Sequence, residues 1–182
     1  MDPYRQRLLA RLDEYEGRYP DELETAARIR ALVGTHATCF ERDHFEPGHI
    51  TGSAWIVNAP GTHALLTHHK KLDRWLQLGG HSDGDGDTAA VALREGEEES
   101  GLKLRFIDSA IFDIDVHEIP ARGSDPAHEH HDLRFLLCAD GDEDYVVSEE
   151  SHDLAWVPLD ELHRFTDEDS VLRLARKWLV RR

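Results

Sequence analysis

The sequence predicts an α/β protein in which helices cover a mixed β-sheet. Strand-like segments stand on both sides of a helix-forming stretch at residues 88–100, and this arrangement favours a sheet with helices packed on it. The chain has 182 residues, of which 40% are hydrophobic and 32% are charged. That composition supplies a core for one globular domain and is too apolar for a disordered chain.

Two helices are expected before the main domain. Asp2 suits an N-cap and Pro3 suits the first turn of the first helix. Its apolar residues at helical spacing are Tyr4, Leu8, Leu12 and Tyr15. The second helix is expected from Pro20 to Val33, with Gly34 as its C-terminal stop and with an apolar side made of Leu23, Ala26, Ala27 and Ile29. We expect this hairpin, residues 1–45, to be a packing extension of a domain at residues 46–182, and a dimer contact is its alternative role.

The main domain opens with a predicted hairpin of two strands, residues 49–58 and 63–68, joined by the turn "APGT". Three more strands are expected at residues 104–119, 132–140 and 154–159, with a loop at 123–128. A closing helix at residues 170–180 has one apolar side, formed by Val171, Leu174, Ala175 and Trp178. These segments complete the predicted mixed sheet.

The charge and the cysteine content of the chain exclude several classes of ligand and metal site. The formal net charge is -16, so the bare surface repels nucleic acid and anionic membranes, and a polyanionic ligand needs bound cations. Cys39 and Cys138 form neither a disulfide framework nor a zinc motif. Since no apolar run reaches the ~18 residues of a membrane span, and the first residues lack a signal-peptide pattern, the expected location is cytoplasmic.

The stretch "LREGEEESGL" places unusual charge on a predicted helix at residues 88–100, which Asp87 caps and Gly101 ends. Glu95, Glu98 and Glu99 stand at i, i+3 and i+4, so they share one side of the helix. Like charges there destabilise a helix, as do anions in its C-terminal half. A bound divalent cation offsets that cost, because magnesium prefers carboxylate oxygens. The alternative is a solvated acidic face.

The run from Gly80 to Leu102 resembles the Nudix box. That pattern is Gly, five residues, Glu, seven residues, Arg-Glu, an apolar residue, any residue, Glu-Glu, any residue, Gly and an apolar residue. Arg94 and Glu95 fill the first charged pair, and Glu98 and Glu99 fill the second. The spacing agrees throughout, so the chain is identified as a member of the Nudix family over roughly residues 48–166.

Two positions depart from the family pattern. Gly86 replaces the first box glutamate, and Gly96 replaces an apolar residue. In the family that glutamate supports the site more than it binds the main metals, and Asp85 or Asp87 is a candidate substitute. Gly96 costs the helix about 1 kcal/mol relative to alanine. These departures put the level of activity in question more than the identity of the family.

The resemblance implies a Nudix fold, an α/β/α sandwich around a mixed β-sheet. It also implies hydrolysis of a pyrophosphate bond in a nucleoside diphosphate linked to another moiety, by attack of water on phosphorus. Mg²⁺ or Mn²⁺ would be the cofactor, held by Glu95, Glu98 and Glu99. Glu98 and Arg94 are the expected catalytic residues within the box, with Arg94 orienting Glu95.

A glycine-rich loop is expected from Gly79 to Asp87, where the backbone can approach a diphosphate. Gly79, Gly80 and His81 are therefore candidate substrate contacts, and bracing of the loop is the alternative role of His81. The general base is expected either in the box or in a late loop. In that late loop Glu149 and Glu150 are the candidates, and we select Glu150; a plain surface turn is the alternative.

Histidines and aspartates recur on two predicted strands. The period of two places Asp113, Asp115 and His117 on one face, opposite Phe112, Ile114 and Val116. If the next strand begins early enough, one of its faces carries His128, His130, Asp132 and Arg134. Arg134 is the candidate substrate contact there, and a second metal site or a solvated sheet face is the alternative. The spacing excludes the zinc-protease motif.

Other motifs in the loop fit poorly. The aspartates of "DGDGD" do not form a calcium loop, because Thr88 and Arg94 occupy its glycine and glutamate positions. "GDGDTA" is a weak dinucleotide-binding match, since its aspartates repel pyrophosphate. The alternative function is a non-catalytic Nudix-like module that binds a nucleotide and regulates a partner. A small-molecule substrate is expected, nucleic acid is disfavoured, and the family resemblance allows a homodimer.

Overall fold

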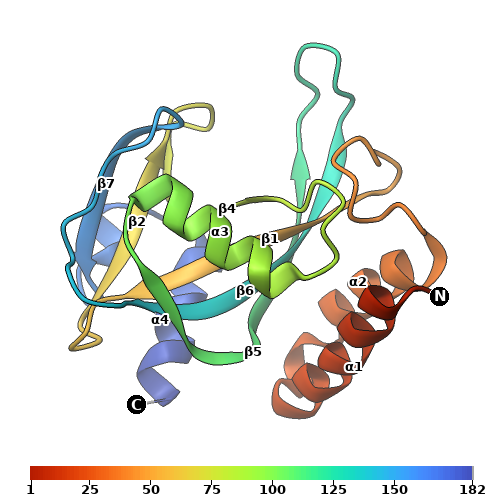
Figure 1. Cartoon of the computed structure of the whole chain (residues 1–182), viewed down its shortest axis with the longest axis horizontal. Coiled ribbons are helices and arrows are strands. Elements are labelled where there is room, and N and C mark those ends of the chain that lie inside the picture. The colour runs from red at the N-terminus through yellow and green to blue at the C-terminus, as the bar shows by residue number, and fades with distance from the viewer. Residues whose placement is uncertain (182) are drawn as a thin grey trace.

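The centre of the protein is a mixed β-sheet, which has seven strands within the described residues (Figure 1). The structure is a computed structural model that describes residues 1–181. The strands are β1 (Gly48–Val57), β2 (His63–His69), β3 (Arg74–Leu76), β4 (Leu78–His81), β5 (Leu104–Ile119), β6 (His128–Ala139) and β7 (Ser151–Pro158). The helices are α1 (Pro3–Arg18), α2 (Leu23–Thr35), α3 (Thr88–Ser100) and α4 (Asp169–Arg181), with 3-10 turns at Pro20–Glu22 and Leu162–Arg164.

β1 lies in the middle of the sheet. It runs parallel to β6, starting where Gly48 pairs with Glu129, and antiparallel to β4, where Thr51 pairs with His81. The order along the main path is β3-β2-β1-β6-β5, while β7 pairs with β2. The starts of β1 and β6 and the end of β4 therefore meet at one place in the sheet.

Helices cover both faces of this sheet (Figure 1). Leu133 and Phe135 of β6 join a core with α1 and α2, whereas Leu136 and Cys138 join the core beneath α4. This is the alternation that a strand imposes on its side chains. Ala89 of α3 belongs to the same core as α1 and α2. The predicted α/β architecture, with helices on a mixed sheet, is confirmed.

The first and last helices form where the sequence predicts. The carboxylate of Asp2 accepts hydrogen bonds from the backbone N–H groups of Tyr4 and Arg5, at 3.0 and 3.1 Å. The apolar side of α4 is buried as expected and consists of Val171, Leu174, Ala175 and Trp178. None of the helices within residues 1–181 is long and apolar enough to cross a bilayer.

The second helix differs from the prediction at both ends. It continues through Gly34 to Thr35 and stops where His36 becomes extended, so Gly34 is not its stop. Leu23 is 49% exposed, and Ala27 is exposed as well. The buried side is formed by Ala26, Ile29, Leu32 and Val33. At 100° per residue, Leu23 and Ala27 lie more than about 100° from the centre of this buried side, so the helix directs both toward solvent.

The predicted hairpin of residues 49–58 and 63–68 is confirmed, but it is short. β1 and β2 pair antiparallel at one register pair, Val57 with Ala64, while β4 pairs with residues 51–54 of β1. β2 pairs along its length with β7. β3 and β4 were not predicted, since strands of three and four residues show no usable alternation.

β5 departs from simple alternation. Its register against β6 shifts between Ile111 and Asp113, and Phe112 packs beneath α4 while Ile111 and Ile114 face α1 and α2. The expectation that Phe112 shares a face with Ile114 is therefore wrong. A β-bulge inserts an extra residue and reverses the side on which the following residues lie.

Candidate active site

α3 carries the acidic side chains that the sequence singled out, and local signals set its ends. The Asp87 carboxylate accepts a hydrogen bond from the N–H of Ala90 at 3.3 Å. Gly101 has a φ of +70°, and its N–H donates to the carbonyl of Glu97 at 2.8 Å. Glycine adopts this left-handed conformation without steric cost. The predicted span of residues 88–100 is confirmed.

Two glycines of β4 let the sheet approach α3 closely. The N–H of Gly79 donates to Oε1 of Glu99 at 2.9 Å. A Cβ on Gly79 would lie 2.4 Å from Oγ of Ser53, and one on Gly80 would lie 2.3 Å from Oε2 of Glu95. At Gly79 the clash includes the Ser53 Cα at 2.6 Å, so this position requires glycine, whereas a side chain at position 80 would displace the Glu95 carboxylate.

The predicted glycine-rich loop begins later than expected. Gly79, Gly80 and His81 pair with residues 51–53 of β1 and form the end of β4. The connecting segment to α3 spans residues 82–87. The short strand was missed because two adjacent glycines suggest a loop. As a consequence, sheet hydrogen bonds fix this backbone beside the carboxylates.

Arg94 links the helix to the strand. Its Nη1 lies 2.6 Å from Oε1 of Glu95 and 3.5 Å from Oε2 of Glu98. Its Nη2 donates to the carbonyl oxygen of His81 at 3.2 Å. The guanidinium therefore holds two of the three box carboxylates and the last residue of β4 in one arrangement.

The three carboxylates lie in different surroundings. Glu99 is 8% exposed, and burial, together with the charges of Glu95 and Glu150, raises its pKa to about 8 against the lowering effect of the Gly79 N–H. Burial also raises the pKa of Glu95, although Arg94 opposes it. The side chain of Glu98 is 64% exposed. Because Glu150 acts electrostatically on both Glu95 and Glu99, the late loop lies near this site.

The carboxylates do not close into a tight cluster. Glu95 and Glu99 lean toward β4, whereas Glu98 extends toward Arg94 and solvent. Within residues 1–181, the one group of three metal-ligating side chains whose donor atoms all lie within 4.8 Å of each other is a set of histidines. Mutual repulsion accounts for the spread of the glutamates.

The donor set nevertheless fits a hard divalent cation. Magnesium and manganese bind carboxylate oxygens, usually one or two carboxylates together with water and phosphate oxygens. The groups that act on buried Glu99 are a backbone N–H and two further carboxylates. A cation at this position would stabilise charges that burial now disfavours.

A family model described as the NUDIX domain matches residues 49–178. The chain belongs to the Nudix family. It is a Nudix pyrophosphohydrolase, which is the class of enzyme that the Nudix box implied. A comparison with curated proteins gave no significant match.

Solved structures share the Nudix fold. A Caenorhabditis elegans Ap4A hydrolase has 20% identity and a TM-score of 0.58, covering 72% of this chain and 95% of its own. The Escherichia coli dihydroneopterin triphosphate pyrophosphohydrolase has 15% identity and a TM-score of 0.58, with coverage of 73% and 96%. A UDP-X diphosphatase has 17% identity and a TM-score of 0.53, with coverage of 98% and 94%. The last match extends over the N-terminal helices of this Nudix protein.

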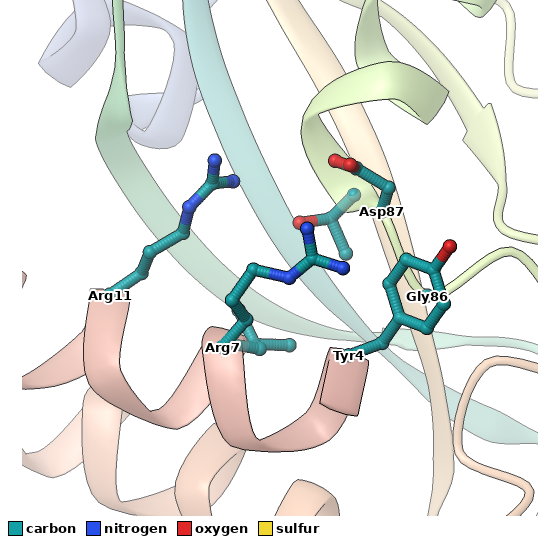
Figure 2. A pocket seen from close by; sticks show the side chains of 7 residues that line it. Tyr4, Arg7, Arg11, Gly86 and Asp87 are labelled. Carbon is teal, nitrogen blue, oxygen red and sulfur yellow. The ribbon is translucent and has the colours of Figure 1, made fainter. Parts of the chain in front are cut away.

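The first departure from the Nudix box has a structural cause. A Cβ at Gly86 would lie 2.4 Å from Cβ and 2.7 Å from Cγ of Tyr4. Figure 2 shows Tyr4, Arg7 and Arg11 of α1 beside Gly86 and Asp87. The N-terminal helix thus occupies the space that a glutamate side chain at position 86 would need.

The two candidate substitutes for that glutamate both serve the backbone. Asp85 accepts a hydrogen bond from the N–H of Asp87 at 2.8 Å, and Asp87 caps α3. Each carboxylate therefore shapes the segment before α3.

The second departure has a similar explanation. A Cβ on Gly96 would lie 2.8 Å from Cδ1 of Leu104 and 3.3 Å from Cβ of Ala54. Glycine at this point lets α3 pack closely on β1. The helix thereby loses some intrinsic propensity and gains a shorter distance to the sheet.

Arg134, expected to contact substrate, is 1% exposed and lies beneath α4. Its Nε donates to Asp132 at 2.8 Å, and its Nη1 donates to Asp113 at 3.2 Å and to the carbonyl of Ser170 at 3.1 Å. Its Nη2 lies 3.3 Å from Asp115. These contacts occupy the guanidinium on all sides, so Arg134 is not part of the site proposed below.

The polar face predicted for β5 lies against α4 and not in a cleft beside α3. Asp113 is fully buried and accepts hydrogen bonds from Arg134, Arg173 and Lys177. β6 begins at His128, four residues before the predicted start at residue 132, so the condition for a strand face that includes His128 and His130 is met. Its His130 meets His49 and His81, a grouping that sequence reasoning missed because His49 stands alone at the start of β1.

Proposed function

We propose that this Nudix protein hydrolyses the diphosphate bond of a nucleoside diphosphate linked to another moiety, with Mg²⁺ or Mn²⁺ as cofactor. The observation that carries the proposal is the buried Glu99 carboxylate, hydrogen-bonded to β4 and surrounded by further acidic groups. A protein of net charge -16 needs cations to bind a diphosphate. The box carboxylates are suited to hold them.

The residues of the Nudix box and of β4 have different roles in this reaction. Glu95, Glu98 and Glu99 would hold the cation, which would neutralise the diphosphate and lower the pKa of a water molecule. Arg94 keeps Glu95 in place and ties it to β4 through the His81 carbonyl. Gly79 and Gly80 are the candidate phosphate contacts, because the backbone of these glycines lies directly beside Glu99 and Glu95.

The proton of the attacking water needs an acceptor. Glu150 is our candidate, because it lies in the loop before β7 and its charge is felt by Glu95 and Glu99. It is exposed, so it can exchange a proton with solvent after each turnover. Glu98, the most exposed of the box carboxylates, is the candidate within the box.

The names of similar structures support this substrate class. They refer to Ap4A, dihydroneopterin triphosphate and UDP-X, each of which contains linked phosphates. A small molecule is therefore proposed as the substrate. The cytoplasmic location and the homodimer stay predictions from the sequence, as does the domain boundary at residue 45.

The proposal is tested by turnover of a substrate panel. The full chain is incubated with Mg²⁺ or Mn²⁺ and with nucleotide sugars, dinucleoside polyphosphates and oxidised nucleoside triphosphates, and products are resolved by mass. Glu98→Gln and Glu99→Gln each lower kcat/KM by at least about 100-fold, because each removes a cation ligand worth several kcal/mol in the transition state.

Glu24→Gln is the matched control, since Glu24 is an exposed glutamate on α2. It leaves turnover unchanged. If wild type releases no product from the whole panel but binds the same nucleotides as tightly as Glu98→Gln does, the non-catalytic regulatory module is the correct function. Gly86, which replaces a supporting glutamate of the box, is the feature that favours this alternative.

A further inference from the structure

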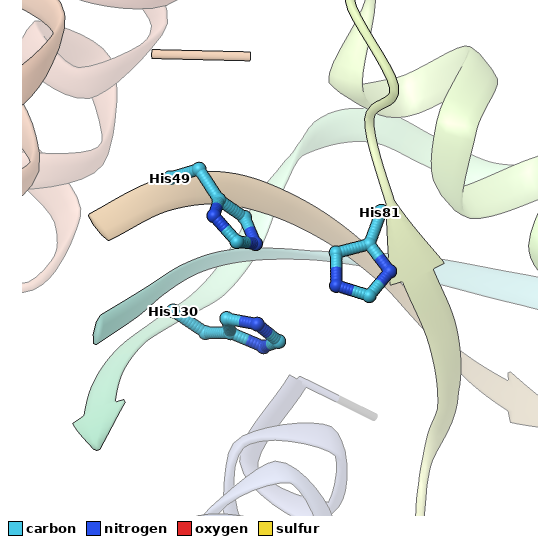
Figure 3. Close-up of side chains that lie close together, drawn as sticks. All are labelled: His49, His81 and His130. Carbon is cyan, nitrogen blue, oxygen red and sulfur yellow. The ribbon is translucent and has the colours of Figure 1, made fainter. Parts of the chain in front are cut away.

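Three histidines from three strands meet at one end of the sheet. His49 begins β1, His81 ends β4 and His130 lies near the start of β6. Figure 3 shows the three rings directed toward one another. Ring centroids are 4.8 Å apart for His49 and His130, and 5.2 Å apart for the two other pairs. One ligand nitrogen from each ring lies within 4.8 Å of the others.

The hydrogen bonds of His49 orient it as a ligand. Its Nδ1 lies 3.3 Å from the carbonyl oxygen of His44. A carbonyl only accepts hydrogen bonds, so Nδ1 carries the proton and Nε2 keeps its lone pair. Metal-ligating histidines in proteins are held in the same way, with the second ring nitrogen donating to a backbone carbonyl or carboxylate.

Burial leaves this lone pair without a partner. His49 is 1% exposed. Within the described residues, the Nε2 atoms of His49 and His130 are buried and have no hydrogen-bond partner. An unpaired buried polar atom costs free energy. A ligand that binds these nitrogens would remove this cost, and the rings of His49 and His130 both point into the same cluster (Figure 3).

The protonation state agrees with this arrangement. Burial, together with neighbouring imidazoles, lowers the pKa of His49 to about 4 and that of His130 to about 2. Burial and the nearby Arg42 also lower the pKa of His81. The rings are neutral at pH 7, which is the form that coordinates metals.

We propose that His49, His81 and His130 form a binding site for a divalent transition metal of the zinc class, separate from the carboxylates of α3. Imidazole nitrogens suit Zn²⁺ and its neighbours Co²⁺ and Ni²⁺, whereas Mg²⁺ requires oxygen ligands. Nitrogens on one tetrahedral zinc stand about 3.3 Å apart at bond lengths of about 2.0 Å. The ligand nitrogens lie within 4.8 Å of one another, so binding of one ion requires each pair to close by up to about 1.5 Å.

A fourth histidine connects the cluster with the surface. His128 packs against His49 and His130, with ring centroids 5.0 and 5.2 Å away. It also lines a surface hollow with Glu118, Pro120 and Glu129.

The position of His81 gives the site a consequence for the Nudix box. Its ring belongs to the histidine cluster, while its carbonyl oxygen accepts a hydrogen bond from Arg94. An ion on this ring fixes the end of β4 and with it the partner of Arg94. The transition metal would thus act as a clamp for three strands, leaving the chemistry to the carboxylates.

Zinc binding to the chelator-treated full chain tests the site. Wild type takes up one Zn²⁺ that excess Mg²⁺ does not displace, and Co²⁺ substitution gives the visible absorption of a nitrogen-ligated tetrahedral ion. His81→Gln and His130→Gln weaken zinc binding by more than about 100-fold, measured by competition with a coloured chelator. His163→Gln, an exposed histidine before α4, binds zinc as wild type does.

Two further measurements keep the result decisive. Glu98→Gln retains the zinc, which separates this site from the carboxylates and from any result on hydrolysis. Anomalous scattering from zinc-soaked wild-type crystals places the ion between the three rings, and it does not depend on the folding of any variant. Zinc found at α3 alone, or equal zinc affinity in wild type and His130→Gln, would overturn the proposal.

Discussion

The two faces of the sheet hold buried carboxylates in opposite electrostatic surroundings. Beneath α4, Asp113 accepts hydrogen bonds from Arg134, Arg173 and Lys177. On the other face, Glu99 of α3 accepts one backbone hydrogen bond, and the neighbouring charges that act on it are those of Glu95 and Glu150. Both carboxylates are at most 8% exposed, so burial alone does not separate them.

The difference is visible in the pKa values. Burial raises the pKa of Asp115 beneath α4, but the hydrogen bond to His117 and the charges of Arg134 and Arg173 outweigh it and lower the pKa overall. For Glu99 burial prevails, and the pKa rises to about 8. An acidic group paired with cations stabilises the fold, whereas one buried without them is prepared for a ligand that brings positive charge.

Asp113→Asn tests the ion-pair network on the α4 face and has the largest expected effect on stability. The substitution leaves three buried or half-buried cations without their shared anion, and breaking a buried ion pair costs about 3–5 kcal/mol. The midpoint temperature of thermal unfolding (Tm) then falls by roughly 6–20 °C. Asp169→Asn is the control, because its side chain is 78% exposed and its pair with Arg176 contributes little. Equal Tm values for the two variants would show that the network is not stabilising.

Glu99→Gln sharpens the comparison through pH. The folded pKa of Glu99, about 8, lies above the ordinary value of 4.5, so the native state loses stability as pH rises from about 4.5 to 8. The amide side chain of the variant does not ionise, so the variant shows no such loss, and it keeps an Oε1 acceptor for the N–H of Gly79.

The stability difference between this variant and wild type is therefore near zero at pH 4.5. It grows to on the order of 4 kcal/mol in favour of the variant at pH 8. Urea unfolding in the presence of a chelator measures it. A difference that stays constant over this pH range would contradict the assigned environment of Glu99, and Mg²⁺ should reduce the difference at pH 8.

Gly86→Glu tests whether the α3 face depends on the N-terminal hairpin. Restoring the Nudix glutamate forces its Cβ into Tyr4, 2.4 Å from the Tyr4 Cβ, and overpacking costs about 1–3 kcal/mol. We expect a lower Tm and no gain in kcat. The double variant Tyr4→Gly/Gly86→Glu recovers part of the lost stability, because removal of the Tyr4 Cβ relieves the shortest contact. An unchanged Tm in Gly86→Glu alone would show that the contact is absent.

The smallest expected change in stability comes from replacing two glycines that lie within helices. Gly96→Ala places a Cβ 2.8 Å from Leu104, whereas Gly34→Ala meets nothing within 4 Å. Alanine gains up to about 1 kcal/mol of helix propensity in both cases, but strain outweighs it at position 96. Chemical unfolding should show Gly34→Ala to be stabilised by up to about 1 kcal/mol and Gly96→Ala to be destabilised by about 1 kcal/mol. Stabilisation of both would mean that α3 packs more loosely on β1.

Local signals made part of this fold predictable. The ends of α3 follow from Asp87 and Gly101, which act within one turn of the helix. The capping of α1 by Asp2 is equally local. The box spacing identified the family because helical geometry fixes which glutamates share a side. These features depend on neighbours in the sequence, so the sequence contains them.

Features set by distant segments were not predictable. The distant partners of Arg134 belong to β5 and α4: Asp113 and Asp115 precede it by about 20 residues, and Ser170 follows it by 36. The partners of His49 lie about 30 and 80 residues away, and the loss of glutamate at position 86 follows from Tyr4. Gly34 illustrates the reverse error, since a glycine marks a helix end only when the chain turns left-handed there.

The contact between Tyr4 and Gly86 also bears on how the protein can be shortened. Residues 49–178 carry the family match, yet removing the first two helices would uncover Phe135 and Ile111 of the shared core. It would also remove the ring that fills the gap next to the loop preceding α3. The N-terminal hairpin and the segment before α3 therefore depend on each other for packing, and a chain without the hairpin is expected to be destabilised at the Nudix box.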